Sequence, residues 1–160
     1  MERIWSPWRY AYIAAAETDM SVCIFCEAQQ DPDKDQENYV VYRAEHNFVI
    51  LNRYPYITGH LMVAPFAHVG ELDAASKAVS DEMMDLAKRC QAALRHIYRP
   101  DGFNLGMNLG SAAGAGIREH YHLHVVPRWN GDANFMTITA ETRVLPEELN
   151  VTYRRLSEAL

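Results

Sequence analysis

Short apolar runs separated by turn residues mark the middle of the chain. The segments 40–43, 47–52 and 60–65 are rich in valine, leucine and isoleucine, a composition typical of β-strands. Pro55 and Gly59 lie between the last two segments and predict a turn. The three segments therefore predict an antiparallel meander.

Apolar residues at helical spacing follow this meander. Ser80 offers an N-cap to the run, and Pro100 stops it. The apolar stripe consists of Met83, Met84, Ala87, Cys90, Leu94 and Ile97. We interpret this stripe as the core-facing side of one long helix.

Two further strands and a second helix complete the pattern. Strands are predicted at 102–108 and 119–128, joined by a loop of small residues at 110–116. A C-terminal helix is predicted at 146–160, because Pro146 suits a first helical turn and apolar residues then recur on one side. The expected fold class is α+β, with a five-stranded antiparallel sheet, one long helix and a C-terminal helix.

The remaining segments are assigned by composition. Residues 1–20 are aromatic-rich, with a short helix expected at 8–16, and we expect them to dock onto the core or across a dimer. Residues 31–38 are polar and acidic, which predicts a loop. With 160 residues and 49% hydrophobic content, the chain is expected to form a single domain over 1–160.

Charge and cysteine content limit the expected partners and compartment. The formal net charge of -6 argues against a surface for nucleic acid or anionic membranes, since both need a diffuse basic field. The chain has three cysteines, no signal-peptide pattern in residues 1–20 and no apolar run of membrane length. We therefore expect a protein of the reducing cytoplasm with neither nucleic acid nor membrane as partner.

The most informative motif is the row His120, His122 and His124, which alternates with Tyr121 and Leu123. In an extended strand the three imidazoles share one face and the intervening side chains share the other. Packing gives no reason to align three polar rings, whereas metal binding and acid–base catalysis do. Histidines can serve as nucleophile, hydrogen-bond donor or metal ligand near neutral pH, which suits chemistry at phosphorus.

A C-x-x-C pair, Cys23 and Cys26, is the second candidate site. In a reducing compartment such a pair binds zinc or does redox work more often than it forms a structural disulfide. His68 and His120 are our candidates for the further ligands of a tetrahedral Cys2His2 site, in which the zinc would be structural. The alternative is that both cysteines pack as small hydrophobic side chains.

Polar groups at strand ends and in the small-residue loop are candidates for ligand contacts. Asn52 can pair with ribose hydroxyls or cap its own turn, and His60 stands across the same turn. The glycines of the 110–116 loop, among them Gly114 and Gly116, allow backbone amides to approach a phosphate closely.

Together these residues resemble the histidine triad (HIT) family, whose hallmark is His-x-His-x-His followed by two apolar residues, here 120–126. The other matching segments are Cys23-x-x-Cys26, Asn52-Arg53, Gly59-His60, residues 65–69 and Gly106-x-Asn108. Segments 5–9 and 127–135 resemble the bacterial branch that acts on diadenosine polyphosphates. Within the latter segment, Trp129 would either stack on a base or cover the sheet edge.

The resemblance implies a homodimer and a two-step nucleotidyl transfer at the α-phosphorus of an adenine nucleotide. His122 would form a nucleotidyl-histidine intermediate, which water or phosphate would then displace. His124 and the loop amides would stabilise the phosphoryl oxygens, with Asn108 as a further polar contact. In related members the residues that match His60 and His68 form a relay behind the triad, so His68 has two competing roles.

The resemblance leaves the acceptor open. Gly116 stands where eukaryotic diadenosine triphosphate hydrolases of the family carry a glutamine, and this departure would favour phosphate over water, as in a phosphorylase. A purine nucleoside phosphoramidase is an alternative that uses the same residues. A non-catalytic nucleotide sensor is a second alternative, against which the intact triad argues.

Overall fold

A computed structural model describes residues 23–132 and 145–160. Its five strands form one sheet in the spatial order β1-β2-β3-β5-β4, and every neighbouring pair is antiparallel. The strands are β1 (Val40–Arg43), β2 (Asn47–Leu51), β3 (Leu61–Pro65), β4 (Gly102–Gly106) and β5 (Leu123–Arg128). The expected α+β class with a five-stranded antiparallel sheet is confirmed. The expected docking of residues 1–20 and the helix at 8–16 lie outside the described residues.

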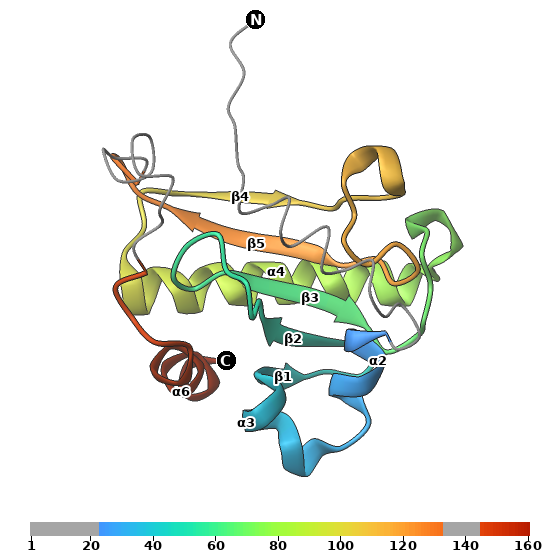
Figure 1. Ribbon diagram of the computed structural model, residues 1–160, viewed down its shortest axis with the longest axis horizontal. Coiled ribbons are helices and arrows are strands. Elements are labelled where there is room, and N and C mark those ends of the chain that lie inside the picture. The colour runs from blue at the N-terminus through green and yellow to red at the C-terminus, as the bar shows by residue number, and fades with distance from the viewer. Residues whose placement is uncertain (1–22, 133–144) are drawn as a thin grey trace, which may run out of the picture.

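The helices differ in the face of the sheet that they cover. They are α2 (Ile24–Gln29), α3 (Asp35–Asn38), α4 (Lys77–Tyr98) and α6 (Leu149–Ala159). Figure 1 shows α4 running along the sheet, with α2 on the other side of the strands and α6 near β1. The two long predicted helices are therefore present, with different boundaries.

The sheet buries apolar side chains on both faces, which explains why β2 and β3 are buried along their whole length. The larger cluster joins alternate strand residues to α4 and α6 and includes Val49, Val63, Leu94, Leu123 and Leu156. The smaller cluster, on the opposite face, packs Phe25 and Ala28 of α2 against Phe48, Ile50 and Met62. A strand covered on both sides reads as a continuous apolar run rather than a strict alternation.

The long helix α4 begins earlier than the sequence suggests. Ser76 is its N-cap and accepts a hydrogen bond from the Val79 amide, whereas the predicted cap, Ser80, lies inside the helix and bonds back to preceding carbonyls. Of the predicted stripe, Met83, Ala87, Cys90 and Leu94 are buried, Ile97 is partly buried, and Met84 is 50% exposed. In the described parts of the chain, no helix combines the length and the apolar composition that membrane crossing requires.

The polar segment 31–38 is helical, so its prediction as a loop was wrong. It forms a 3-10 turn at Pro32–Lys34 followed directly by α3. The Asp31 side chain accepts a hydrogen bond from the Asp33 amide at 3.1 Å, and Pro32 occupies the first position of the turn. Capping and proline placement thus outweigh polar composition here.

Other predicted boundaries extend too far. Only His124 of the histidine row lies in the ladder, because β5 pairs with β3 from Leu123 onward, while the Tyr121 amide bonds to the Val69 carbonyl at 2.8 Å. Strands β2 and β4 end before Asn52 and Asn108, and β3 begins after His60. Helix α6 begins at Leu149 with Glu148 as its N-cap, so Pro146 lies before the helix rather than in its first turn.

Gly59 allows the turn between β2 and β3 to place His60. Its φ is +79°, a conformation that residues with a Cβ rarely adopt. A Cβ at this position would also approach Leu94 Cδ2 to 2.8 Å. The turn therefore packs directly against α4.

A carboxylate on α4 holds the connection between β1 and β2. Glu82 accepts hydrogen bonds from the amides of Glu45 and His46 at 3.1 and 2.9 Å and from Asn47 Nδ2 at 2.8 Å. Burial opposes ionisation, but these donors outweigh it and hold the pKa of Glu82 below its usual value. The ionised form is therefore stabilised by the native fold.

We predict that Glu82→Gln lowers the free energy of unfolding by about 1 kcal/mol at neutral pH, since a partly exposed charged hydrogen-bond network is screened by solvent. Because the pKa of Glu82 is lower in the folded state, its carboxylate adds stability at pH values above the unfolded-state pKa. This stability is lost as the pH falls through the folded-state pKa. Denaturant titrations should therefore show the difference from wild type shrinking as the pH falls below the unfolded-state pKa of a glutamate, about 4.3. Asp85→Asn, which removes an exposed pair with Lys88, is the control and should change stability little; a constant penalty for Glu82→Gln would contradict the prediction.

Candidate active site and metal centre

The triad histidines lie where the chain enters β5, on the face of the sheet opposite α4. His124 pairs with Met62 of β3 and Gly106 of β4, while His120 and His122 lie in the stretch before the strand. His120 is fully buried and His122 is 6% exposed. The intervening Tyr121 and Leu123 belong to the α4-facing core, so the predicted division into a chemical and a packing face is present.

His122 carries an unprotonated nitrogen on one side of its ring. Its Nδ1 lies 3.0 Å from the backbone oxygen of His120, which can only accept a hydrogen bond, so Nδ1 carries the proton. Burial lowers the pKa of His122, partly offset by this hydrogen bond, so the ring is neutral at neutral pH. A neutral imidazole with Nδ1–H keeps the lone pair on Nε2.

A second hydrogen-bond chain determines the proton position on His124. The Tyr56 amide donates to His60 Nδ1 at 3.1 Å, which places the proton of a neutral His60 on Nε2. That Nε2 lies 2.9 Å from His124 Nδ1 and donates to it. A neutral His124 therefore carries its own proton on Nε2. Its ring meets the His122 ring edge to face, with ring centroids 4.8 Å apart.

A cavity of about 770 Å³ opens beside His124. It is bounded by β4, by the end of β5, by the turn before His60 and by the residues that lead into α6. Its lining includes the aromatic and apolar side chains Tyr56, Ile57, Tyr98, Leu105, Met107, Val126 and Trp129. Its polar lining includes Asn104, Asn108, Arg128, Asp132, Glu147 and Arg155. Ligand pockets typically measure about 300–1,000 Å³, so the volume suits a ligand of nucleotide size.

The structure brings some of the predicted ligand-contacting residues to this cavity and leaves others elsewhere. Asn108 and Trp129 line it, whereas Asn52 is not among its lining residues. Asn52 Oδ1 accepts from the Tyr54 amide at 2.9 Å, which is the capping role given as its alternative. The Gly114 amide donates to the Ser111 carbonyl at 3.1 Å within its own turn, and Gly116 also lies outside the described lining.

The far end of the cavity holds a polar cluster that the sequence analysis missed. Glu147 accepts hydrogen bonds from the Tyr98 hydroxyl and from Thr152 Oγ1, and it pairs with Arg155 at 3.0 Å. Burial, together with the hydrogen bond to Glu147, raises the pKa of Tyr98 to about 12, so this hydroxyl stays protonated. The cluster forms only where the end of α4 meets α6 and the residues just before it. No local sequence signal therefore marks it.

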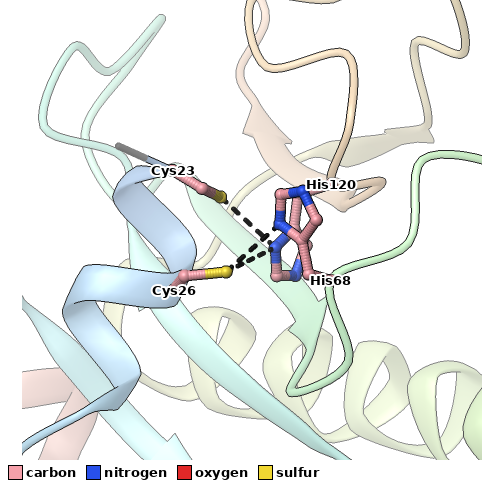
Figure 2. Close-up of side chains that lie close together, drawn as sticks. All are labelled: Cys23, Cys26, His68 and His120. Atoms are coloured by element: carbon pink, nitrogen blue, oxygen red, sulfur yellow. Dashed lines mark hydrogen bonds between the residues drawn. The ribbon is translucent and has the colours of Figure 1, made fainter. Parts of the chain in front are cut away.

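The four predicted metal ligands also meet in space. Figure 2 shows Cys23, Cys26, His68 and His120 converging from α2, the loop after β3 and the stretch before β5. One ligand atom from each lies within 4.8 Å of all the others. His120 Nδ1 is 3.4 Å from the Cys23 sulfur and 3.7 Å from the Cys26 sulfur. A Cys2His2 set of this kind is typical of structural zinc sites.

The arrangement of both histidines suits a metal. His120 Nε2 lies 2.8 Å from the Pro65 carbonyl, so it carries the proton and leaves Nδ1 free towards the sulfurs. Burial lowers the pKa of His120 to about 4, with the charges of His68 and His122 adding to the effect. His68 Nδ1 lies 3.2 Å from the Cys26 sulfur, and its Nε2 faces the Glu119 carboxylate at 3.8 Å. A carboxylate behind a ligating histidine is a common arrangement.

Two competing roles were open for His68, and the structure places it beside the cysteines. The hydrogen-bond chain behind the triad instead runs through His60. The donor set therefore fits zinc, with His68 among the potential ligands.

The fold and the site together define a class: a small α+β enzyme with three histidines in a row, the last of which, His124, lines a cavity. The family profile described as "HIT domain" matches residues 33–131, and the chain belongs to this family.

Two relatives extend the comparison over most of the chain. A Mycobacterium tuberculosis protein named AP-4-A phosphorylase is 40% identical over 162 aligned residues, which cover 98% of this chain and 83% of the relative. The crystal structure of a Zn-bound histidine triad family protein from Mycobacterium smegmatis matches with a TM-score of 0.68 at 30% identity. That match covers 88% of this chain and 93% of the other.

A third comparison comes from an archaeon. A hypothetical histidine triad nucleotide-binding protein from Sulfolobus tokodaii has a TM-score of 0.68 at 27% identity. The match covers 86% of this chain and 91% of the other. The fold is therefore shared across distant members of the family.

We predict that His60→Leu releases His124 from its single tautomer, because His124 Nδ1 loses its donor. The ¹⁵N shifts of the His124 ring should then move towards the average of the two neutral tautomers. His60→Gln keeps an N–H donor and serves as the control, with thermal unfolding used to confirm that both variants fold. Unchanged His124 shifts in folded His60→Leu would contradict the hydrogen-bond chain described above.

Proposed function

We propose that this protein cleaves dinucleoside polyphosphates such as diadenosine tetraphosphate at the α-phosphorus, through a nucleotidyl intermediate on His122. The observation that carries the proposal is the hydrogen bond from His122 Nδ1 to the His120 carbonyl, which leaves the Nε2 lone pair available. A neutral, oriented imidazole is an effective nucleophile without an added base.

In the first step, His122 Nε2 forms a bond to the α-phosphorus as the bond to the bridging oxygen breaks. With diadenosine tetraphosphate, AMP stays on the histidine and ATP leaves. The Nε2–H of His124, held by His60, stabilises the charged oxygens around phosphorus. Phosphoryl transfer depends mostly on such positioning and electrostatic stabilisation, which agrees with the buried and rigid surroundings of the row.

In the second step, an acceptor oxygen attacks the same phosphorus and the bond to Nε2 breaks, which regenerates the histidine. Phosphate as acceptor yields ADP, and water yields AMP. We favour phosphate, because Gly116 offers no side-chain amide to orient water and the M. tuberculosis relative is named as a phosphorylase.

The cavity beside His124 supports a substrate that extends beyond a single phosphate. Trp129 and Tyr56 offer aromatic surface for a base, and Asn108 offers a polar contact at the catalytic end. The proposed contacts of Asn52 to ribose, and of the Gly114 and Gly116 amides to phosphate, stay predictions that need these groups to turn from their present partners.

We also propose a homodimer. Strand β4 is an edge of the sheet, and its residues Asn104, Leu105 and Gly106 are exposed. An edge strand with free hydrogen-bonding groups is a ready surface for pairing with a second copy. This surface adjoins the cavity, since the same three residues line it.

We further propose that Cys23, Cys26, His68 and His120 hold a structural zinc ion. The geometry of the four donors supports this, as does the Zn-bound relative from M. smegmatis. When bound, the metal cross-links α2 to the start of β5.

Product analysis of diadenosine tetraphosphate breakdown tests the proposed reaction. We expect ADP and ATP in the presence of phosphate, and slow or no breakdown without it. AMP and ATP formed equally well without phosphate would make the protein a hydrolase and end the phosphorylase proposal.

The nucleophile has its own test in the same assay. His122→Gly should lower kcat by about 10⁴-fold or more, as the removal of a covalent nucleophile does in other enzymes. His46→Gly, which removes a histidine remote from the triad in sequence, should leave turnover near the wild-type value. Unchanged turnover in His122→Gly would refute the covalent mechanism.

Metal analysis tests the zinc proposal. Protein purified without chelators should hold about one zinc per chain, and Cys26→Ser should lose it because a hydroxyl is a poor zinc ligand. Cys90→Ala is the matched control, since Cys90 is buried in α4 away from the cluster, and it should keep the metal. Full zinc content in Cys26→Ser would exclude this sulfur as a ligand.

A further inference from the structure

His120 belongs to two sites at once. Its ring Nδ1 faces the sulfurs of Cys23 and Cys26 in the metal-ligand cluster (Figure 2). Its backbone carbonyl accepts the hydrogen bond that orients His122. One residue therefore connects the potential metal ligands to the proposed nucleophile.

The position of the His120 ring is closely tied to the position of its backbone. The residue has no exposed surface, and its Nε2 donates to the Pro65 carbonyl at the end of β3. If the His120 ring shifts on the side of the cysteines, it cannot rotate into solvent to accommodate the shift. It must move the backbone, and with it the carbonyl that holds His122.

Phe25 provides a second connection. It stands between the two cysteines in α2, is 1% exposed, and its ring centroid lies 5.1 Å from that of His120 and 4.7 Å from that of His122. The last turn of α2 is held by Arg43, which donates to the Gln29 carbonyl. The first turn has no side-chain cap at Cys23, so this end is held by the packing of Phe25 against Phe48 and by the ligand cluster.

We propose that the Cys23–Cys26–His68–His120 cluster, when it holds its metal, positions the His122 ring for attack through the His120 carbonyl and the Phe25 ring. This inference rests on the proposed function, because it takes His122 as the nucleophile. Cys23, Cys26 and His68 are then positioning residues, because they act on His122 through His120 and Phe25 and not on the substrate. The cluster should affect kcat more than substrate binding.

His68→Ala is the most informative variant. The His68 side chain is 45% exposed, so its removal should disturb packing little, and the variant keeps both His120 and Phe25 in the sequence. We expect loss of zinc, a fall in kcat of about 10-fold or more, as for other groups that orient a reacting residue, and a KM within about twofold of wild type. His68→Cys gives a Cys3His set, which zinc also accepts, and should restore both zinc and kcat.

A structural readout that does not depend on turnover accompanies the kinetics. In zinc-loaded wild type, the ¹⁵N shifts of His122 should report a single tautomer with the proton on Nδ1. In His68→Ala, and in wild type stripped with a chelator, the same signals should broaden or move towards the tautomer average. His46→Ala is the control for loss of a partly exposed histidine outside the cluster and should leave zinc, His122 signals and kcat unchanged.

The proposal is overturned if zinc-free protein, from His68→Ala or from chelator treatment, keeps wild-type His122 signals and kcat. It is also overturned if wild type purified without chelators holds no metal. Its failure is separable from that of the proposed function. The tautomer and zinc measurements need no substrate. If the His122 signals depend on the metal as expected but no dinucleoside polyphosphate is cleaved, only the proposed function is refuted.

Discussion

The hydrogen bond from His122 Nδ1 to the His120 carbonyl is the contact on which the proposed chemistry depends. It fixes the tautomer and the ring orientation together, so a buried imidazole presents a lone pair rather than a proton. Burial alone would keep the ring neutral but would not choose which nitrogen is free. The hydrogen-bond chain through His60 makes the opposite choice for His124, and two adjacent rings thereby acquire complementary roles.

The two faces of the sheet separate stability from chemistry. Residues that alternate along β5 pack against α4 on one side, while the histidines and Phe25 share the other. The turn at Gly59 contributes to both, because it packs on Leu94 of α4 and places His60 behind His124. A rigid hydrophobic layer therefore supports polar groups whose orientation must be held closely, as catalytic groups require.

Much of this arrangement could be predicted from local pattern. Alternation at 120–124 identified the histidine face, short apolar runs identified three strands, and the other two strands were predicted on either side of the small-residue loop at 110–116. The sequence could not reveal contacts between distant segments: the Glu82 contacts with the β1–β2 connection and the Tyr98–Glu147–Arg155 cluster form only after folding. The start of α4 was misplaced because serine is a good N-cap at either Ser76 or Ser80. The structure uses Ser76.

The separation of the metal ligands along the chain has a consequence for assembly. Cys23 and His120 are 97 residues apart, and Cys26 and His68 are 42 apart. Closing such long loops costs conformational entropy before any contact repays it, and an unfolded chain can offer an ion only the adjacent thiols. During synthesis, complete coordination must therefore wait until most of the polypeptide has emerged and the central strands have paired. Under the zinc proposal, the metal would therefore bind late, to a nearly native molecule, rather than at the start of folding.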